Sequence, residues 1–340
     1  MTASRIELFE SPSKQVNHSV LLGVILPPDF ERAAAPLPLC IFLHGGGGDR
    51  SMAVEMQPLY DALWAAGTLT PMVIVSASTG PLSWYAGPWE EYIATELPTV
   101  MAEKFGTRSD SSGVVLTGLS MGGYGTLKIA CRRPERFAAI AALEPGIEPG
   151  LRRADAKPRN TFYRFPEKDT ELYGAPVDEQ RWQQDNPANI VQAHAEAIRT
   201  SPMEIYLEAG DEDDLNLHDG TEFLHRLLWD LDIRHEYHCV RWAGHVGPSL
   251  GTRFREAFVF LSHALQGGLS AAKPITPTAE EQQWLAWMNG GMVGEGPEVD
   301  LLNSTRGPGL LDCVFEDKLA AARRVDPSFA RAYAQLPKGE

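Results

Sequence analysis

A serine between a predicted strand and a predicted helix is the strongest chemical signal in this sequence. Val114–Gly123 reads Val-Val-Leu-Thr-Gly-Leu-Ser-Met-Gly-Gly, and a helical pattern continues to Arg132. Gly-x-Ser-x-Gly in this context is typical of a nucleophile elbow, a tight turn that strains the serine backbone and exposes its hydroxyl. A Cβ at Gly118 or Gly122 would collide with the neighbouring strand or helix. The motif also occurs by chance, but the flanking elements favour Ser120 as a nucleophile.

A glycine-rich loop after an earlier apolar strand is the second signal. Leu39–Leu43 leads through a histidine into four glycines, Gly45–Gly48. Glycine lets the backbone approach a substrate oxygen, where two N–H groups stabilise an oxyanion. We predict the N–H groups of Gly46, with Gly45 as the alternative, and of Met121 as these donors. A phosphate-binding loop is disfavoured, because no Gly-Lys-Ser/Thr follows and no Gly-x-Gly-x-x-Gly opens a helix.

A serine nucleophile also needs a general base and an acid that orients the base. His245 follows the strand pattern Glu236–Arg241 and stands where the base comes in the chain order serine, acid, histidine. The acid is expected after the strand Glu204–Glu208, within the run Asp-Glu-Asp-Asp. The spacing Gly-x-x-Asp selects Asp213, while Asp214 remains a competitor.

The same acidic run, Asp211–Asp214, has an alternative interpretation as a divalent-cation site. It lacks the spacing and the supporting glycine of an EF-hand loop. His235 and His238 are three residues apart on a predicted strand and therefore point to opposite faces. We expect no metal site.

Apolar runs alternate with helical patterns up to about residue 268. The predicted strands are Val20–Leu26, Leu39–Leu43, Met72–Ser76, Val114–Gly118, Ala138–Leu143, Glu204–Glu208 and Glu236–Arg241. The predicted helices are Met52–Ala66, Glu90–Phe105, Met121–Arg132, Ala188–Thr200, Gly220–Asp230 and Arg253–Leu265. This alternation predicts an α/β fold with a mainly parallel central sheet and helices on both faces.

Two segments interrupt that alternation. Residues 145–184 are long, charged and proline-containing, and we interpret them as an excursion over the sheet edge or the active-site mouth. After Gly267 the composition changes again. We therefore predict a catalytic domain over residues 1–267 and a C-terminal extension over 268–340 that is not an independent domain.

Composition and charge exclude several classes of protein. The 340 residues include 30 basic and 45 acidic side chains, a formal net charge of −15. We therefore expect neither nucleic acid nor an anionic membrane surface as a partner. No stretch approaches the roughly 20 apolar residues of a membrane span, and the N-terminal residues lack the order of a secretory signal. Four widely spaced cysteines suit reduced thiols, and we expect a cytoplasmic protein.

These motifs together resemble the putative-esterase family of α/β hydrolases, which includes S-formylglutathione hydrolase (esterase D), feruloyl esterases and mycolyltransferases. The resemblance covers roughly residues 18–265. It rests on Gly118-Leu119-Ser120-Met121-Gly122-Gly123-Tyr124-Gly125, on Trp89-Glu90-Glu91-Tyr92-Ile93 with Glu96-Leu97-Pro98, on Gly210-x-x-Asp213, and on Gly244-His245.

The resemblance implies a triad of Ser120, Asp213 and His245, with Met121 and Gly46 as backbone donors. Aligning on the downstream Asp-Gly pair instead favours Asp214. The four-glycine loop differs from the bulkier loop of the S-formylglutathione hydrolases, so that particular thioester is not implied.

The expected activity is that of a serine esterase that cleaves a carboxylic ester, or a thioester, of a small molecule through an acyl-enzyme. An acyltransferase with an alcohol or sugar acceptor and a non-catalytic binding protein are the alternatives. No metal or organic cofactor is required, and a homo-oligomer stays open. Trp84, Tyr85 and Trp89 follow the third strand and are candidates for the substrate pocket, with ordinary packing as the competing interpretation.

Overall fold

A computed structural model describes residues 3–267, 279, 282–283 and 286–287 of the chain. The chain divides into two compact units, Met1–Leu269 and Ser270–Glu340. The first unit contains every motif discussed above. The predicted extension, 268–340, falls almost entirely outside the described residues and stays a prediction.

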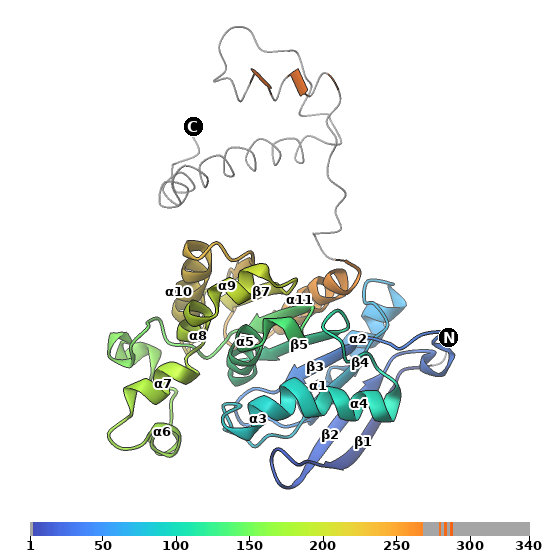
Figure 1. The fold of residues 1–340 in the computed structure, drawn as a ribbon, viewed down its shortest axis with the longest axis horizontal. Helices are drawn as coiled ribbons and strands as arrows, with labels where there is room; N and C mark the ends of the chain where they lie inside the picture. Colours follow the sequence, from blue (N-terminus) through green and yellow to red (C-terminus); the bar gives the residue numbers. More distant parts are fainter. Residues whose placement is uncertain (1–2, 268–278, 280–281, 284–285, 288–340) are drawn as a thin grey trace. The chain divides into compact units, whose positions relative to one another are not determined.

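The described residues form an eight-stranded sheet in the order β1-β2-β4-β3-β5-β6-β7-β8 (Figure 1). The strands are β1 (Arg5–Pro12), β2 (Ser19–Leu26), β3 (Leu39–Leu43), β4 (Val73–Ala77), β5 (Val114–Leu119), β6 (Ala139–Leu143), β7 (Glu204–Gly210) and β8 (Glu236–Val240). β1 and β2 pair antiparallel, as do β2 and β4, and the other pairs are parallel. The predicted fold class is confirmed.

Helices cover both faces of this sheet. The α-helices are α1 (Ser51–Glu55), α2 (Gln57–Ala65), α3 (Pro88–Glu91), α4 (Leu97–Phe105), α5 (Met121–Arg132), α6 (Pro166–Tyr173), α7 (Glu179–Asp185), α8 (Pro187–Ala193), α9 (Ala195–Thr200), α10 (Leu217–Asp230) and α11 (Leu250–Leu265). Short 3-10 turns are η1 (Phe30–Arg32), η3 (Pro134–Arg136), η4 (Arg153–Asp155) and η5 (Pro158–Asn160), and η2 (Tyr92–Glu96) is a π-helical turn. No helix of the described residues has both the length and the apolar character needed to cross a membrane.

Alternate side chains of each central strand enter two separate hydrophobic cores. In β3, Ile41 belongs to the core that α4, α5, α8 and α10 cover, whereas Phe42 belongs to the core under α1, α2 and α11. Successive side chains of a strand point to opposite faces, so a strand buried on both faces reads as an unbroken apolar run. This explains why the central strands were recognisable in the sequence.

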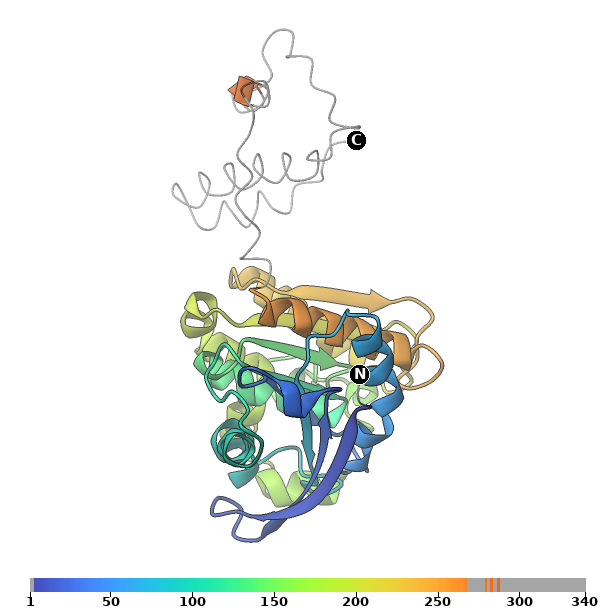
Figure 2. The same cartoon turned by 90° about the vertical axis from the view of Figure 1, so that its right-hand side faces the viewer.

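The edge strand β1 was not predicted. Its side chains are mostly exposed or half-buried, and it pairs with β2 alone. Figure 2 shows the β1–β2 hairpin, in blue, at the edge of the sheet opposite β8, in gold. A strand with one pairing partner and one wet face carries a weak apolar signal.

Prolines divide two of the predicted helices. The helix expected over Met52–Ala66 is interrupted, and Pro58 lies in the first turn of α2, where its missing N–H costs nothing. The helix expected over Glu90–Phe105 contains the π-helical turn η2 just before Pro98. The helix expected over Ala188–Thr200 is divided into α8 and α9 at His194, whose ψ of 15° departs from helical values.

The close approach of α5 to β3 fixes the turn that carries Ser120. A Cβ added at Gly122 would collide with the carbonyl oxygen of Leu43, and one added at Gly118 would lie 2.5 Å from the Gly122 backbone. Real Cβ atoms do not tolerate these separations from backbone. The expected steric need for glycine at both positions is confirmed.

We predict that Gly122→Ala destabilises the protein, because the backbone of β3 cannot move away from the new methyl group without breaking its pairing. The free energy of unfolding should fall by about 2–3 kcal/mol in urea titrations followed by circular dichroism. Gly251→Ala is the matched control, because Gly251 lies in α11 with open space around its Cβ position. That control should leave stability unchanged or raise it slightly, and an equal loss in both variants would contradict the steric explanation.

Candidate active site

The candidate residues lie at the carboxyl ends of neighbouring strands. Ser120 directly follows β5, and Asp213 and His245 lie in the loops after β7 and β8. β5, β6, β7 and β8 are consecutive in the sheet and parallel, so their carboxyl ends share one edge. This edge is where ligands bind in open α/β sheets.

Ser120 has the strained backbone expected of a nucleophile elbow. Its φ of 59° and ψ of −116° lie in a region that side-chain-bearing residues rarely adopt. The Ser120 N–H donates to the carbonyl of Leu143 at 2.9 Å, and the Ser120 carbonyl accepts from Tyr124 at 2.9 Å and Gly146 at 3.1 Å. These bonds to β6 and α5 hold the turn in place.

His245 and Asp213 are hydrogen-bonded. The distance from His245 Nδ1 to Asp213 Oδ2 is 3.3 Å, and Asp213 is 3% exposed. Asp213 Oδ1 also accepts from the Leu215 N–H at 2.6 Å. Burial raises the pKa of Asp213, but the interactions with His245, with Glu144 and with the Leu215 N–H outweigh it and hold that pKa below its ordinary value. Asp213 therefore stays ionised and can orient the imidazole.

Asp214, the competing candidate for the acid, has a more exposed side chain than Asp213. The side chain of Asp214 is exposed, as is that of Asp211. Asp211 Oδ1 accepts from the Trp242 N–H at 2.6 Å, which ties the two loops together. Of the acidic run, Asp213 is thus the residue in contact with His245.

No hydrogen bond joins His245 to Ser120 within the part of the chain that is described. Catalytic hydrogen bonds are often long or poorly aligned in proteins without substrate, and they tighten when it binds. The His245 loop itself is anchored, because Arg253 Nη1 of α11 donates to the Gly244 carbonyl at 2.8 Å.

The glycine-rich loop is held by the side chain of His44. The Thr79 N–H donates to His44 Nε2 at 3.3 Å, so His44 Nδ1 carries the proton and donates to the Gly45 carbonyl at 2.9 Å. Burial lowers the pKa of His44, which keeps this imidazole neutral. The Gly45 carbonyl also accepts from Gly48 at 3.1 Å.

This arrangement leaves one loop N–H without a partner. A trans peptide is planar, so the Gly46 N–H points opposite to the restrained Gly45 carbonyl. The Gly45 N–H faces Met52 Sδ at 3.5 Å and the Gly47 N–H donates to Pro81 at 2.7 Å, whereas that of Gly46 has no acceptor among the described residues.

The loop lies beside the elbow. A Cβ added at Gly45 would be 3.7 Å from Ser120 Cβ. Met121 begins α5, so its N–H has no carbonyl one turn earlier within the helix. The Gly46 and Met121 amides are thus both available near Ser120.

The three aromatic candidates for the pocket have different surroundings. Trp84 is 6% exposed, and its backbone N–H contacts Met121 Sδ of the elbow at 3.3 Å. Tyr85 is fully buried, and its hydroxyl donates to the His44 carbonyl at 2.9 Å. Trp89 packs edge-on against Tyr92, with ring centroids 5.7 Å apart. The contacts of Tyr85 and Trp89 are those of packing residues.

The excursion 145–184 reaches back to the elbow through an arginine that the sequence analysis missed. Arg164 stacks its guanidinium over Trp84, 3.8 Å from the ring centroid, and donates from Nε to Glu148 Oε1 at 2.7 Å. Both partners of this ion pair are buried. Cation–π stacking restricts the Trp84 ring, whose backbone N–H contacts Met121 at the elbow.

A buried cluster of two carboxyl groups and one guanidinium near Asp213 was also not predicted from the sequence. It contains Glu144, directly after β6, Glu208 of β7, and Arg253 of α11, which are all at most 1% exposed. The available signal was a charged residue at the end of an apolar strand. An unpaired charge there would be costly, so it implies a partner elsewhere in the chain.

Glu144, Asp213 and His245 also have side-chain donor atoms that all lie within 4.8 Å of one another, a spacing that suits a metal ion. Arg253 already places a positive charge on Glu144, and His245 Nδ1 faces Asp213. A second cation would compete with both contacts, so we interpret the group as a hydrogen-bonded cluster.

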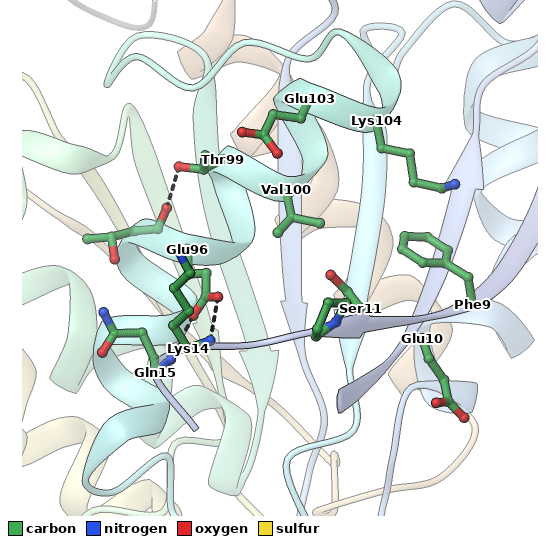
Figure 3. A pocket seen from close by; sticks show the side chains of 12 residues that line it. Phe9, Glu10, Ser11, Lys14, Gln15, Glu96, Thr99, Val100, Glu103 and Lys104 are labelled. Atoms are coloured by element: carbon green, nitrogen blue, oxygen red, sulfur yellow. Dashed lines mark hydrogen bonds between the residues drawn. The ribbon is translucent and has the colours of Figure 1, made fainter. Parts of the chain in front are cut away.

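A cavity of about 750 Å³ lies away from these residues, at the β1 edge of the sheet (Figure 3). Its lining comes from β1, the turn after it, η2 and α4, and includes none of the candidate catalytic residues. Glu96 closes one side, where its carboxylate accepts from Ser13 Oγ at 2.8 Å and from the Lys14 N–H at 2.9 Å. We assign this cavity no part in catalysis.

Comparison with known families identifies the chain. Residues 13–246 match the model of the family Esterase, described as "Putative esterase", which is more than half of the chain. The chain belongs to this esterase family. The resemblance inferred from the elbow and histidine motifs is confirmed.

Two curated relatives show how far the similarity of this esterase-family chain extends. An esterase of Mycobacterium tuberculosis, Rv1288, is 31% identical over 132 residues, which cover 36% of the chain and 28% of the relative. The diacylglycerol acyltransferase/mycolyltransferase Ag85A of Mycobacterium ulcerans is 27% identical over 218 residues, covering 58% and 61%. The chain thus spans less than two thirds of the length of either relative.

Among solved structures, a ferulic acid esterase superposes with a TM-score of 0.64 at 20% identity. The match covers 78% of the chain and 100% of that protein. At this identity the likeness establishes the α/β-hydrolase fold of the esterase-family chain.

The backbone strain at Ser120 predicts that replacing this serine with glycine or with alanine has different effects on stability. Ser120→Gly should be more stable than Ser120→Ala by about 1 kcal/mol, because glycine accepts this positive φ and alanine keeps the Cβ. The greater flexibility of unfolded glycine offsets part of the gain. Urea unfolding of the two variants measures the difference, and equal stabilities would show that the turn stores no strain.

Proposed function

We propose that the protein is a serine esterase that cleaves a carboxylic ester through a covalent acyl-enzyme. The observation that carries the proposal is the hydrogen bond between His245 and the buried Asp213, in loops that share a sheet edge with the strained Ser120. Membership of the esterase family supports the same activity.

In the proposed mechanism, His245 Nε2 removes the proton of the Ser120 hydroxyl as its oxygen attacks the ester carbonyl carbon. His245 then donates that proton to the leaving alcohol, and the acyl group remains on Ser120. A water molecule attacks the acyl-enzyme with His245 again as base, which releases the acid and restores the serine. Asp213 remains ionised throughout and stabilises the imidazolium.

The oxyanion would be held by the backbone N–H groups of Gly46 and Met121. Support comes from the restrained Gly45 carbonyl, which directs the Gly46 N–H outward, and from the position of Met121 at the start of α5. The helix N-terminus adds a favourable dipole end for negative charge. Such preorganised donors are usually the largest single contribution to acyl-transfer catalysis.

The proposed substrate is a small-molecule ester, and a thioester is chemically equivalent for this site. Trp84 is the aromatic residue best placed to line the acyl or alcohol pocket. The mechanism requires neither a metal ion nor an organic cofactor, and the net charge of −15 disfavours nucleic acid and anionic membranes as partners. The cytoplasm remains the proposed location, supported by the free thiols of Cys40, Cys131 and Cys239.

Acyl transfer to an alcohol or sugar is the second candidate, since a curated relative is named as an acyltransferase. The same acyl-enzyme would form, and the acceptor alone would differ. Adding alcohols to an esterase assay separates the two activities. A transferase produces new ester in preference to free acid at alcohol concentrations far below that of water.

The first prediction for this mechanism concerns the nucleophile. Ser120→Ala should abolish hydrolysis of p-nitrophenyl acetate and labelling by a fluorophosphonate probe, while its circular dichroism spectrum stays that of the wild type. Labelling is followed by mass spectrometry of the Ser120 peptide. A wild-type protein that neither labels nor hydrolyses short esters would favour the non-catalytic alternative.

A second prediction distinguishes the two acids. Asp213→Asn should lower kcat by about 10³–10⁴-fold, because the imidazole loses the anion that orients it. Asp214→Asn is the matched control and should stay within about twofold of wild type, since Asp214 is exposed. The reverse pattern in steady-state kinetics would assign the acid to Asp214.

A further inference from the structure

Two buried carboxyl groups, those of Glu144 and Glu208, contact a single buried guanidinium next to the buried carboxyl group of Asp213. Glu144 and Glu208 are fully buried, Asp213 is 3% exposed, and Arg253 is 1% exposed. Arg253 Nε donates to Glu208 Oε1 at 2.7 Å, and Arg253 Nη2 donates to Glu144 Oε1. This cluster of three acids contains one guanidinium, and buried charge of one sign is costly unless it is compensated.

Glu144 is held rigidly within this group. Its N–H donates to the Glu208 carbonyl at 2.8 Å, and its Oε1 accepts from the Gly210 N–H at 2.8 Å as well as from Arg253. Its φ of 42° is unusual for a glutamate. Backbone and side chain are therefore both fixed by β7 and α11.

The second oxygen of the Glu144 carboxyl, Oε2, has different surroundings from Oε1. Glu144 Oε2 is buried and accepts no hydrogen bond from the described residues. One oxygen of the Glu144 carboxyl lies within 4.8 Å of one oxygen of the Asp213 carboxyl, and both lie within 4.8 Å of a ring nitrogen of His245. The proximity of Asp213 raises the pKa of Glu144. Two ionised carboxylates at this separation would repel each other strongly.

We propose that Glu144 is a positioning residue that keeps its proton and donates it in a hydrogen bond to the carboxylate of Asp213. This inference rests on the proposed function, in which Asp213 orients His245. The proton stays on Glu144 throughout the reaction. Its effect is to satisfy one side of the Asp213 carboxylate, so that the other side remains an ionised acceptor for His245.

The electrostatic surroundings agree with this assignment. Burial, together with Asp213 and Glu208, raises the pKa of Glu144 to about 10 despite the opposing effect of Arg253. Burial also raises the pKa of Glu208, which Arg253 opposes. Other titratable groups that act on this cluster include His245, Tyr237 and His238 of β8, Glu256 of α11, and Tyr163. Arg253 thus neutralises Glu208 in part, and the proton on Glu144 removes a second buried charge.

The test compares Glu144→Gln with Glu144→Ala in the full chain. Glutamine is isosteric with a protonated glutamate: its carbonyl accepts from Gly210 and Arg253, and its amide donates to Asp213 but cannot ionise. Glu212→Gln is the control for charge removal, because the Glu212 side chain is exposed in the loop of Asp213.

The first measurement is the pH profile of kcat/KM for p-nitrophenyl acetate, corrected for spontaneous hydrolysis. We expect Glu144→Ala to lose at least about tenfold at pH 7.5 and Glu144→Gln to restore most of that loss. Wild type should decline as the pH rises through about 10, where Glu144 loses its proton. The glutamine variant should lack this decline, and the Glu212→Gln profile should match wild type.

The second measurement is the difference in Tm between Glu144→Gln and wild type, from pH 5 to pH 9. An unfolded glutamate ionises near pH 4.3, whereas buried Glu144 keeps its proton, so rising pH favours the unfolded wild type. The Tm of the glutamine variant should therefore rise relative to wild type, by several degrees across this range.

The proposal is overturned if the Tm difference is independent of pH or falls as the pH rises. A difference independent of pH is the result expected of an ionised Glu144 paired with Arg253, because that carboxyl would be ionised in both the folded and the unfolded state across this range. The proposal also fails if glutamine is as inactive as alanine. The Tm comparison needs no activity, so a protein that does not label at Ser120 refutes the proposed function and still reports the protonation of Glu144.

Discussion

A single buried guanidinium joins the elements that carry the candidate active site. Arg253 projects from α11 and binds Glu208 of β7, Glu144 after β6 and the Gly244 carbonyl beside His245. Removing the Arg253 side chain would leave buried carboxyl groups without their cation, and an uncompensated buried charge is strongly destabilising. This one side chain thus ties α11 to the ends of β6 and β7 and to the His245 loop.

Backbone strain is concentrated at the same edge of the sheet. Ser120 and Glu144 are the first residues after the neighbouring strands β5 and β6, and both have positive φ. Each is restrained by backbone hydrogen bonds to the adjacent strand, Ser120 to Leu143 and Glu144 to Glu208. The sheet supplies the free energy that keeps two unfavourable turns in place, and both turns present side chains toward the candidate site.

The glycine-rich loop, Gly45–Gly48, is also held in one conformation by hydrogen bonds from its neighbours. His44 has no substrate contact assigned to it, yet its neutral imidazole fixes the Gly45 carbonyl and therefore the direction of the Gly46 N–H. Tyr85 supports the loop through the His44 carbonyl. Tyr85, a candidate for the substrate pocket, therefore supports the glycine-rich loop through a hydrogen bond.

Features of the fold that depend on local pattern could be predicted from the amino-acid sequence. The central strands and α5 were predictable because burial on both faces leaves unbroken apolar runs. The tight turn at Ser120 was predictable because a close strand-to-helix connection requires glycine at fixed positions around it. The family followed from the same motifs. Edge strand β1 and the breaks near Pro58 and Pro98 were missed, because local pattern is weak at a sheet edge and tolerant of proline in a first turn.

Which acid contacts His245 becomes clear only in the folded chain. Asp213 and Asp214 are adjacent in the chain and chemically identical, and they differ only in which side of the loop after β7 they face. The cluster of Glu144, Glu208 and Arg253 was equally hidden, because its members are separated by 64 and 45 positions (208 − 144 and 253 − 208). Local spacing carries no information about partners that meet only when parallel strands align, and charge compensation in the interior is a property of that alignment.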